Sequence, residues 1–250
     1  MKFSFFSILF ILSVTSTVFA YHPLITDDTG TQGKGRFQYE LNIEYGHDKE
    51  EGVKTDETAI GMTFTYGLVD NLDIALGIPY LILKEENGKT IEEDGIGDLA
   101  FDIKYRFYEK DGLRIAMKPG IGFPTGDYER RLGSGKVTGR IFLIIDKEFE
   151  PVTLFFNAGY IRNENKVAER RDLWHISLAG EYKLKENFKI VLNTGIETNP
   201  EKGSDTHPTF LLGGLVYSIS ESFDLSGGIK TGLNSAETDL SVLAGITLRF

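Results

Sequence analysis

The feature that most constrains this chain is a two-residue alternation of apolar and polar side chains, repeated in segments of about a dozen residues. The last segment shows it best, because Leu240, Val242, Ala244, Ile246, Leu248 and Phe250 alternate mostly with small, polar or charged residues. Successive side chains of a β-strand point to opposite faces of the sheet. The segment therefore predicts a strand with one apolar face, and no part of the chain keeps the period of a helix.

The same period recurs along the chain and predicts about twelve strands, with 10 to 14 left open. The other segments are 37–45, 60–68, 72–80, 99–107, 113–123, 137–149, 152–163, 172–184, 188–198, 208–219 and 223–233. The inward phase is open for 137–149 and 208–219. Short turns at 69–71, 109–112, 150–151, 185–187 and 220–222 alternate with longer polar loops near 48–56, 85–95, 125–136, 164–171, 199–207 and 234–238. In an outer-membrane barrel such alternation puts the short turns on the periplasmic side.

Strand length favours a membrane barrel over a soluble sandwich. Twelve residues rising ~3.3 Å each and tilted by about 40° span roughly 30 Å, more than the ~25 Å apolar band of an outer-membrane barrel. Strands of a soluble β-sandwich, the alternative, average about five or six residues. The chain has no cysteine, and a sheet closed on itself needs no disulfide. We predict an all-β fold, a single closed antiparallel transmembrane β-barrel of outer-membrane type over residues 35–250.

The first 34 residues have a different character. Lys2, the apolar run 5–14 and the sequence Val18-Phe19-Ala20 predict a cleaved signal peptide over 1–20, and hence export to the outer membrane of a Gram-negative bacterium. Residues 21–34 carry Asp27 and Asp28 and too few acidic ligands for a standard calcium loop. We expect this segment to be either a plug folded into the periplasmic mouth of the barrel or a plain flexible leader.

The inward positions predict a charged lumen. By the alternation, the lumen-lining residues are Glu40, Glu44, Asp102, Lys104, Arg106, Arg114, Lys118, Glu181, Lys183 and Arg249. Charge ladders that neutralise each other across neighbouring strands are the simpler interpretation. Residues 102–118, however, share one wall with excess positive charge, which would favour anions in an open lumen.

Little in the sequence predicts catalysis or a cofactor. The four histidines have no metal-ligand spacing, and His175 with Ser177 on the same strand face is more typical of a solvated lumen than of an active site. We therefore expect no metal, no cofactor and no enzymatic activity. The 37 acidic residues against 27 basic ones offer no footprint for nucleic acid.

Several motifs in order along the chain resemble the outer-membrane family called "MetA-pathway of phenol degradation", or simply "transporter". They are residues 22–35 (HPLITDDTGTQGKG), 66–68 (YGL), 72–73 (LD), 78–80 (IPY), 95–99 (GIGDL) and 123–127 (FPTGD). The resemblance implies a barrel that admits hydrophobic or aromatic small molecules, and it brings no catalytic residues and no phenol substrate with it. The terminal Phe250 resembles the signature that the barrel-assembly machinery recognises, besides being the last lipid-facing residue.

These features together predict a passive outer-membrane channel or transporter for small molecules, hydrophobic or aromatic ones among them. A structural or surface barrel with a filled lumen is the alternative, and a barrel enzyme that modifies lipid or cleaves protein is a more remote one. The expected partners are outer-membrane lipid, the barrel-assembly machinery and an unidentified small solute.

Overall fold

A computed structural model describes residues 21–50 and 52–250, so the predicted signal peptide lies outside the described residues. The strands are β1 (Phe37–Glu50), β2 (Val53–Val69), β3 (Leu72–Glu86), β4 (Thr90–Ile96), β5 (Leu99–Lys110), β6 (Leu113–Phe123), β7 (Thr138–Phe149), β8 (Val152–Arg162), β9 (Asp172–Lys185), β10 (Phe188–Glu197), β11 (Thr209–Ser220), β12 (Phe223–Gly232) and β13 (Leu240–Arg249). One 3-10 turn, η1 (Tyr128–Arg130), lies between β6 and β7. The described part of the chain contains no helix that is long and apolar enough to cross a membrane.

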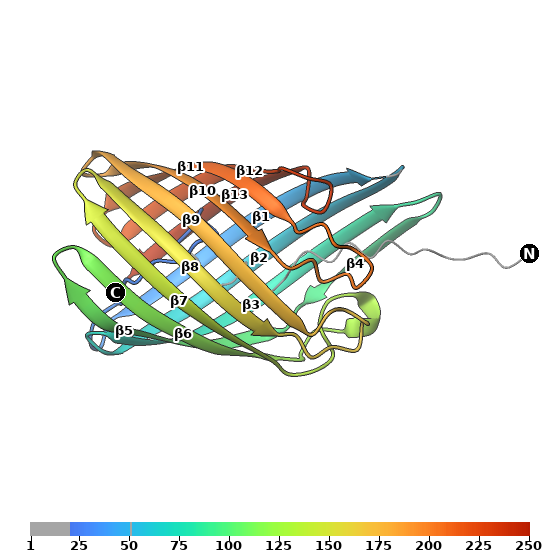
Figure 1. Cartoon of the computed structure of the whole chain (residues 1–250), viewed down its shortest axis with the longest axis horizontal. Coiled ribbons are helices and arrows are strands. Elements are labelled where there is room, and N and C mark those ends of the chain that lie inside the picture. The colour runs from blue at the N-terminus through green and yellow to red at the C-terminus, as the bar shows by residue number, and fades with distance from the viewer. Residues whose placement is uncertain (1–20, 51) are drawn as a thin grey trace, which may run out of the picture.

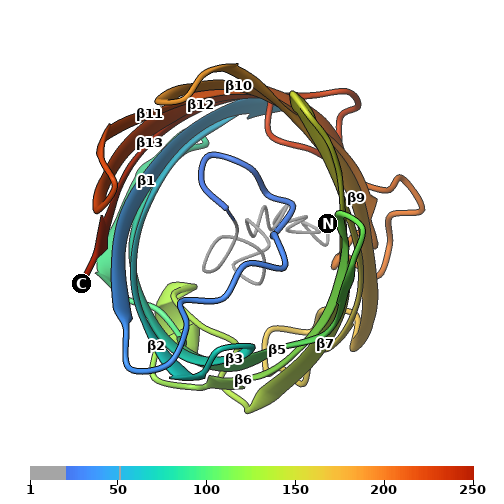
Figure 2. The same ribbon diagram turned by 90° about the vertical axis from the view of Figure 1, so that its left-hand side faces the viewer.

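The sheet is a closed antiparallel barrel (Figures 1 and 2). Neighbours in sequence pair except β4 and β5, and β1 pairs with β13 to close the ring. Strands β4 and β5 both pair with β3, β5 with its first half and β4 with its second. They form one interrupted strand of the wall, broken at Gly97 and Asp98, so the barrel has twelve strands across the wall. The predicted fold class and strand number are confirmed.

The five short turns lie where the sequence predicts them and share one end of the barrel with Phe250 (Figure 1). Two of the six predicted loops are wrong. Residues 48–56 and 85–95 belong largely to strands, because the β1–β2 and β3–β4 hairpins extend beyond the rest of the wall at the opposite end. Their charged residues broke the apolar alternation on which the prediction relied, whereas backbone pairing continues without it.

The outer face follows the alternation closely. Large apolar residues from every side of the barrel are exposed there, among them Phe64, Leu76, Ile103, Ile121, Leu143, Leu178, Leu192, Leu215, Ile229 and Val242. An exposed apolar belt this extensive is stable when lipid rather than water covers it.

The inner face is less uniformly polar than the alternation suggested. An apolar cluster lies inside the barrel on β8 to β13 and comprises Leu24, Phe155, Ala179, Val191, Phe210, Leu212, Val216 and Leu243. Leu24 comes from the segment that precedes β1, so this part of the inner wall is covered by the chain's own N-terminal residues.

Candidate functional site: a segment bound inside the lumen

Residues 21–34, here called the lead segment, lie inside the ring of strands. Figure 2 shows the segment in blue, crossing the lumen as seen from the short-turn end. Thr26 and Thr29 have no exposed surface, and Leu24 is 3% exposed. These residues of the segment are therefore buried within the barrel.

Polar side chains of the wall hold the backbone of the lead segment. The Asn193 side-chain oxygen on β10 accepts from the N–H groups of Ile25 and Thr26, at 2.7 and 3.1 Å. Asn157 on β8 accepts from the Asp27 N–H at 2.8 Å and donates to its carbonyl at 2.9 Å. These bonds satisfy buried backbone groups that would otherwise be costly to leave without partners.

Hydroxyl groups extend this attachment. Thr26 Oγ1 donates to Ser177 Oγ on β9 at 2.8 Å. The N–H and hydroxyl of Thr29 both donate to the Asp146 carboxylate on β7, at 2.9 and 2.5 Å. Consecutive residues of the lead segment therefore bind to consecutive strands of the wall.

The strongest attachment is electrostatic. The Asp27 carboxylate receives Lys104 Nζ from β5 at 2.9 Å and Lys118 Nζ from β6 at 2.5 Å. Burial alone would raise the pKa of Asp27, but the two ammonium groups outweigh it and hold this pKa below its ordinary value. Lys104 Nζ also donates to the Asp28 carbonyl at 2.9 Å.

The start of the lead segment lies on glycines. A side chain at Gly214 would come within 2.6 Å of Pro23, and one at Gly245 within 2.6 Å of His22. These two positions need glycine because the segment approaches the backbone of β11 and β13 closely. Nearby, Tyr21 donates from its hydroxyl to Glu181 at 2.9 Å and accepts from Lys189 at 2.8 Å.

The lead segment joins β1 through a turn that is fixed to the barrel rim. Gln32 N–H donates to Asp73 on β3 at 2.9 Å, and Lys34 N–H donates to Asp70 at 3.2 Å. Gly33 and Gly35 have φ values of +83° and +79°, which glycine adopts without strain.

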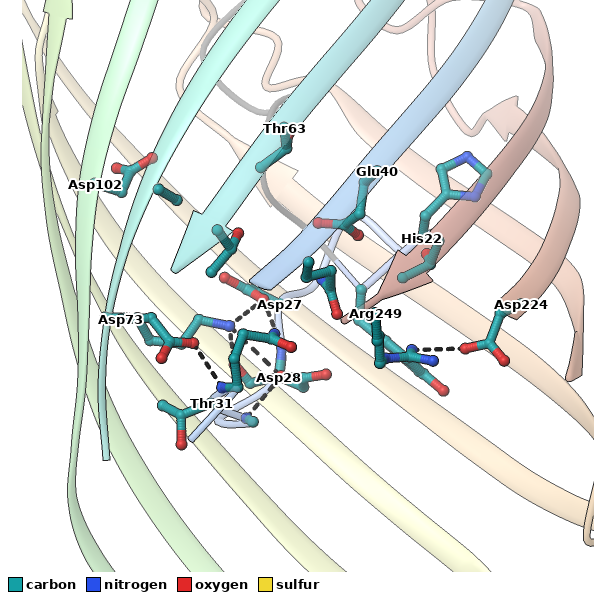
Figure 3. A pocket seen from close by; sticks show the side chains of 18 of the residues that line it. His22, Asp27, Asp28, Thr31, Glu40, Thr63, Asp73, Asp102, Asp224 and Arg249 are labelled. Carbon is teal, nitrogen blue, oxygen red and sulfur yellow. Dashed lines mark hydrogen bonds and ion pairs between the residues drawn. The ribbon is translucent and has the colours of Figure 1, made fainter. Parts of the chain in front are cut away.

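Two cavities remain beside the lead segment. One of about 310 Å³ lies toward β1, β2, β3 and β5 and is lined by Asp27, Lys104 and Lys118 among others (Figure 3). The second, of about 660 Å³, lies toward the β7–β11 side and includes Glu186 and Asn187 of one short turn and residues 218–221 at the end of β11. The segment thus divides the lumen without filling it.

The structure separates the predicted lumen residues into groups. Asp102, Lys104 and Lys118 come together near the lead segment, and Glu181 lies at its start. Glu44 lies toward the loop end, 3.0 Å from Lys230, which also binds Glu237 at 3.2 Å. Glu40 and Arg249 line the smaller cavity, and Arg249 binds Asp224 at 2.6 Å.

The remaining predicted residues lie nearer the short-turn end. Arg114 lies 3.7 Å from Asp146 and lines the larger cavity. Arg106 binds Glu109 at 3.1 Å. Lys183 is exposed near the end of β9 and lines neither cavity. Asp28 lies beside Asp27 and lines both cavities.

Sequence reasoning missed four binding partners on the inner face of the wall. Asn157, Asn193 and Asp146 each occupy an inward position of a predicted strand, and a lone asparagine between apolar residues was the available signal. Arg140, which binds Asp102 through two contacts of 2.9 and 2.6 Å, was missed because the phase of its strand was open. His175 Nδ1 donates to the Glu197 carboxylate at 3.0 Å, and Ser177 binds the lead segment rather than His175.

The long loop 124–137 closes part of the opposite end. Its Leu132 is 1% exposed and packs on Ala59 and Leu81 inside the wall. Arg131 binds Glu85 at 2.7 Å. Arg130 also binds Glu93 at 2.5 Å, so the loop is anchored by one apolar and two ionic contacts.

Solved structures with a similar fold are outer-membrane proteins. An outer-membrane channel from Pseudomonas putida F1 is similar with a TM-score of 0.70 and 13% identity, covering 89% of this chain and 98% of that chain. The NanC porin has a TM-score of 0.55 at 8% identity, covering 83% and 98%. The toluene transporter TbuX of Ralstonia pickettii has a TM-score of 0.51 at 10% identity, covering 87% and 89%. At these identities the likeness shows the outer-membrane barrel fold.

No curated protein matches the sequence. Residues 22–250 match the family described as "Putative MetA-pathway of phenol degradation", a span that includes all thirteen strands and the lead segment except Tyr21. The chain therefore belongs to this family.

Proposed function

We propose that the protein is an outer-membrane channel for passive passage of small molecules, hydrophobic or aromatic ones among them, and that the lead segment gates it. The observation that carries this proposal is a segment that crosses the lumen yet leaves a cavity on each side. Family membership and the fold shared with outer-membrane channels support the location and the class of function. The toluene transporter among the similar structures supports apolar solutes.

The attachment of the lead segment suits a gate more than a permanent core. Most of its partners are polar side chains, and water could replace each of them when the segment leaves. If the segment leaves the lumen, a small pore results. Twelve strands enclose a backbone ring of about 24 Å in diameter, and inward side chains narrow it further.

A second function has its own supporting observation. The apolar cluster that Leu24 completes resembles a packed interior, which suits a structural or surface barrel with a permanently filled lumen. We propose no catalytic function, because the inward histidine and serine bind other partners.

A disulfide between the lead segment and the wall tests the gate in the full chain. Thr26 Oγ1 and Ser177 Oγ lie 2.8 Å apart, so the Thr26→Cys/Ser177→Cys variant suits a disulfide, and the chain contains no other cysteine. We expect planar-bilayer conductance in reducing buffer and silence after oxidation. Each single-cysteine variant serves as a control and should not respond to oxidation.

The other outcomes separate the two functions. Equal conductance in both redox states would exclude the lead segment as the gate. Silence in both states would favour the filled barrel, and deletion of residues 21–34 would then show whether the empty wall conducts, provided that heat-modifiable migration on a gel shows a folded barrel.

A further inference from the structure

The Asp27 site has the form of a binding site for a carboxylate. Each carboxylate oxygen has its own ammonium group, Lys104 Nζ at 2.9 Å and Lys118 Nζ at 2.5 Å. The register of β5 and β6, in which Asp102 pairs with Gly120 and Tyr105 with Met117, sets the two lysines side by side on the inner face. The wall therefore presents two positive charges spaced for one carboxylate.

These lysines lie away from bulk water. Their side chains are 16% and 9% exposed. Two neighbouring ammonium groups at such a depth need an anion, because buried charges without one are costly. Asp102 is the acidic residue next to them on the inner face of β5. Its carboxylate accepts hydrogen bonds from Nε and Nη2 of Arg140. When the lead segment leaves the lumen, the Asp27 carboxylate goes with it. The two lysines then form a site that favours another anion.

There is room beside this site for the rest of a small molecule. The cavity of about 310 Å³ contacts both lysines and is lined further by small or uncharged groups such as Thr63, Ala75 and Val216 (Figure 3). Charged residues also face it, and the acidic ones, Glu40, Asp73, Asp102 and Asp224, outnumber Arg36 and Arg249, which disfavours a second negative charge on the ligand. The volume is at the lower end of ligand-binding pockets, roughly 300 to 1,000 Å³.

We infer that Lys104 and Lys118 form a carboxylate site on the lumen wall, which Asp27 occupies in the closed barrel and a small organic monocarboxylate occupies in the open one. The inference rests on the proposed gating function and specifies one class of solute for it. Asp27 acts as a built-in competitor, so a solute of this class favours release of the lead segment.

Benzoate binding to the full chain in detergent tests the site, with benzyl alcohol as the neutral match of similar size. Asp27→Asn keeps the shape of the segment and removes the carboxylate that binds both lysines, so that the only acidic side chain of the segment still near them is Asp28, whose Oδ1 lies 3.5 Å from Lys104 Nζ. By isothermal titration calorimetry we expect this variant to bind benzoate on the order of tenfold more tightly than the native chain does, and on the order of tenfold more tightly than benzyl alcohol. Adding Lys118→Gln should remove that preference, whereas adding Lys183→Gln, outside both cavities, should keep it.

The result that overturns the inference is equal binding of benzoate and benzyl alcohol, or no binding of either, by the Asp27→Asn chain. That comparison decides even if the Lys118→Gln chain does not fold, and Lys104→Gln provides a second test of the lysines. The conductance experiment with the cysteine pair does not involve benzoate, so failure of this site would not contradict the proposed gate. Silence of the cysteine pair in both redox states would count against the gate alone.

Discussion

At the scale of single residues, the two faces of one strand impose opposite demands. Ile103 is 37% exposed on the outer face of β5, while its neighbours Asp102 and Lys104 are bound inside. A charge on the outer face must enter lipid, whereas one on the inner face meets polar partners. Alternate residues of the strand thus contact either the membrane lipid or the polar groups of the lumen.

Ile103→Arg should therefore destabilise the barrel by roughly 2 to 4 kcal/mol, the cost of an arginine on the lipid face near the bilayer midplane. Ala75→Ser, on the inner face of the neighbouring strand β3 beside the smaller cavity, should change stability by less than about 0.5 kcal/mol. Chemical denaturation of both variants in lipid vesicles measures the difference. Similar losses for the two would mean that the faces are wrongly assigned.

His22 provides a residue-scale prediction on pH. Its burial against the wall lowers its pKa from 6.5 to about 4, with the charge of Glu44 opposing this shift. When the lead segment is released from the wall, or undocked, His22 takes up a proton more readily than when the segment is bound there, or docked. Docking of the lead segment is therefore strongest above about pH 6.5 and weakens as the pH falls toward 4.

In planar bilayers, the open fraction of the native channel should rise as the pH falls from 6.5 to 4. Asp27 responds only near the lower end of this range, because the two ammonium groups hold its pKa below its ordinary value. His22→Asn should weaken this response, so that its open fraction changes less between pH 6.5 and 4 than that of the native channel does. An unchanged pH response in that variant would assign the effect to another group.

At the scale of elements, the apolar contact of loop 124–137 with the wall depends on one side chain. Leu132→Ala removes most of the side chain that packs beside Ala59 and Leu81. In a well-packed site this substitution costs about 2 to 5 kcal/mol of stability. We expect trypsin to cleave after Arg130 and Arg131 several times faster. Val137→Ala, at a position 55% exposed, is the matched control and should not alter the rate. A rate unchanged by the Leu132 substitution would show that ionic contacts alone hold the loop.

The elements also show what the sequence could and could not predict. Twelve strands and five short turns followed from alternation, because lipid on one side imposes the same pattern on every strand. The extended β1–β2 and β3–β4 hairpins did not, since beyond the lipid their charged residues need no apolar face. The lead-segment contacts were out of reach for another reason. Thr29 binds Asp146 and Ile25 binds Asn193 across 117 and 168 residues, and no local pattern encodes such pairs.

At the scale of the whole molecule, closure joins the two ends of the barrel sequence. Phe250 N–H donates to the Phe37 carbonyl at 2.9 Å, and Phe37 N–H donates to the Phe250 carbonyl at 3.1 Å. These are backbone bonds, so they do not depend on the Phe250 side chain. That side chain is 74% exposed and contributes little to packing in the folded barrel.

Phe250→Ala can therefore separate assembly from stability. If the side chain is an assembly signal, the variant should refold in vitro with a free energy of unfolding within about 0.5 kcal/mol of the native value, as is usual for a surface substitution. In cells, the amount of folded barrel in the outer membrane should fall several-fold, as measured by heat-modifiable migration of membrane fractions. Leu240→Ala, an exposed substitution at the other end of β13, controls for loss of lipid contact. If both variants lose the same amount in cells, the terminal phenylalanine acts as one more lipid-facing residue, and closure of the barrel needs only the backbone bonds that its last residue makes with the first strand.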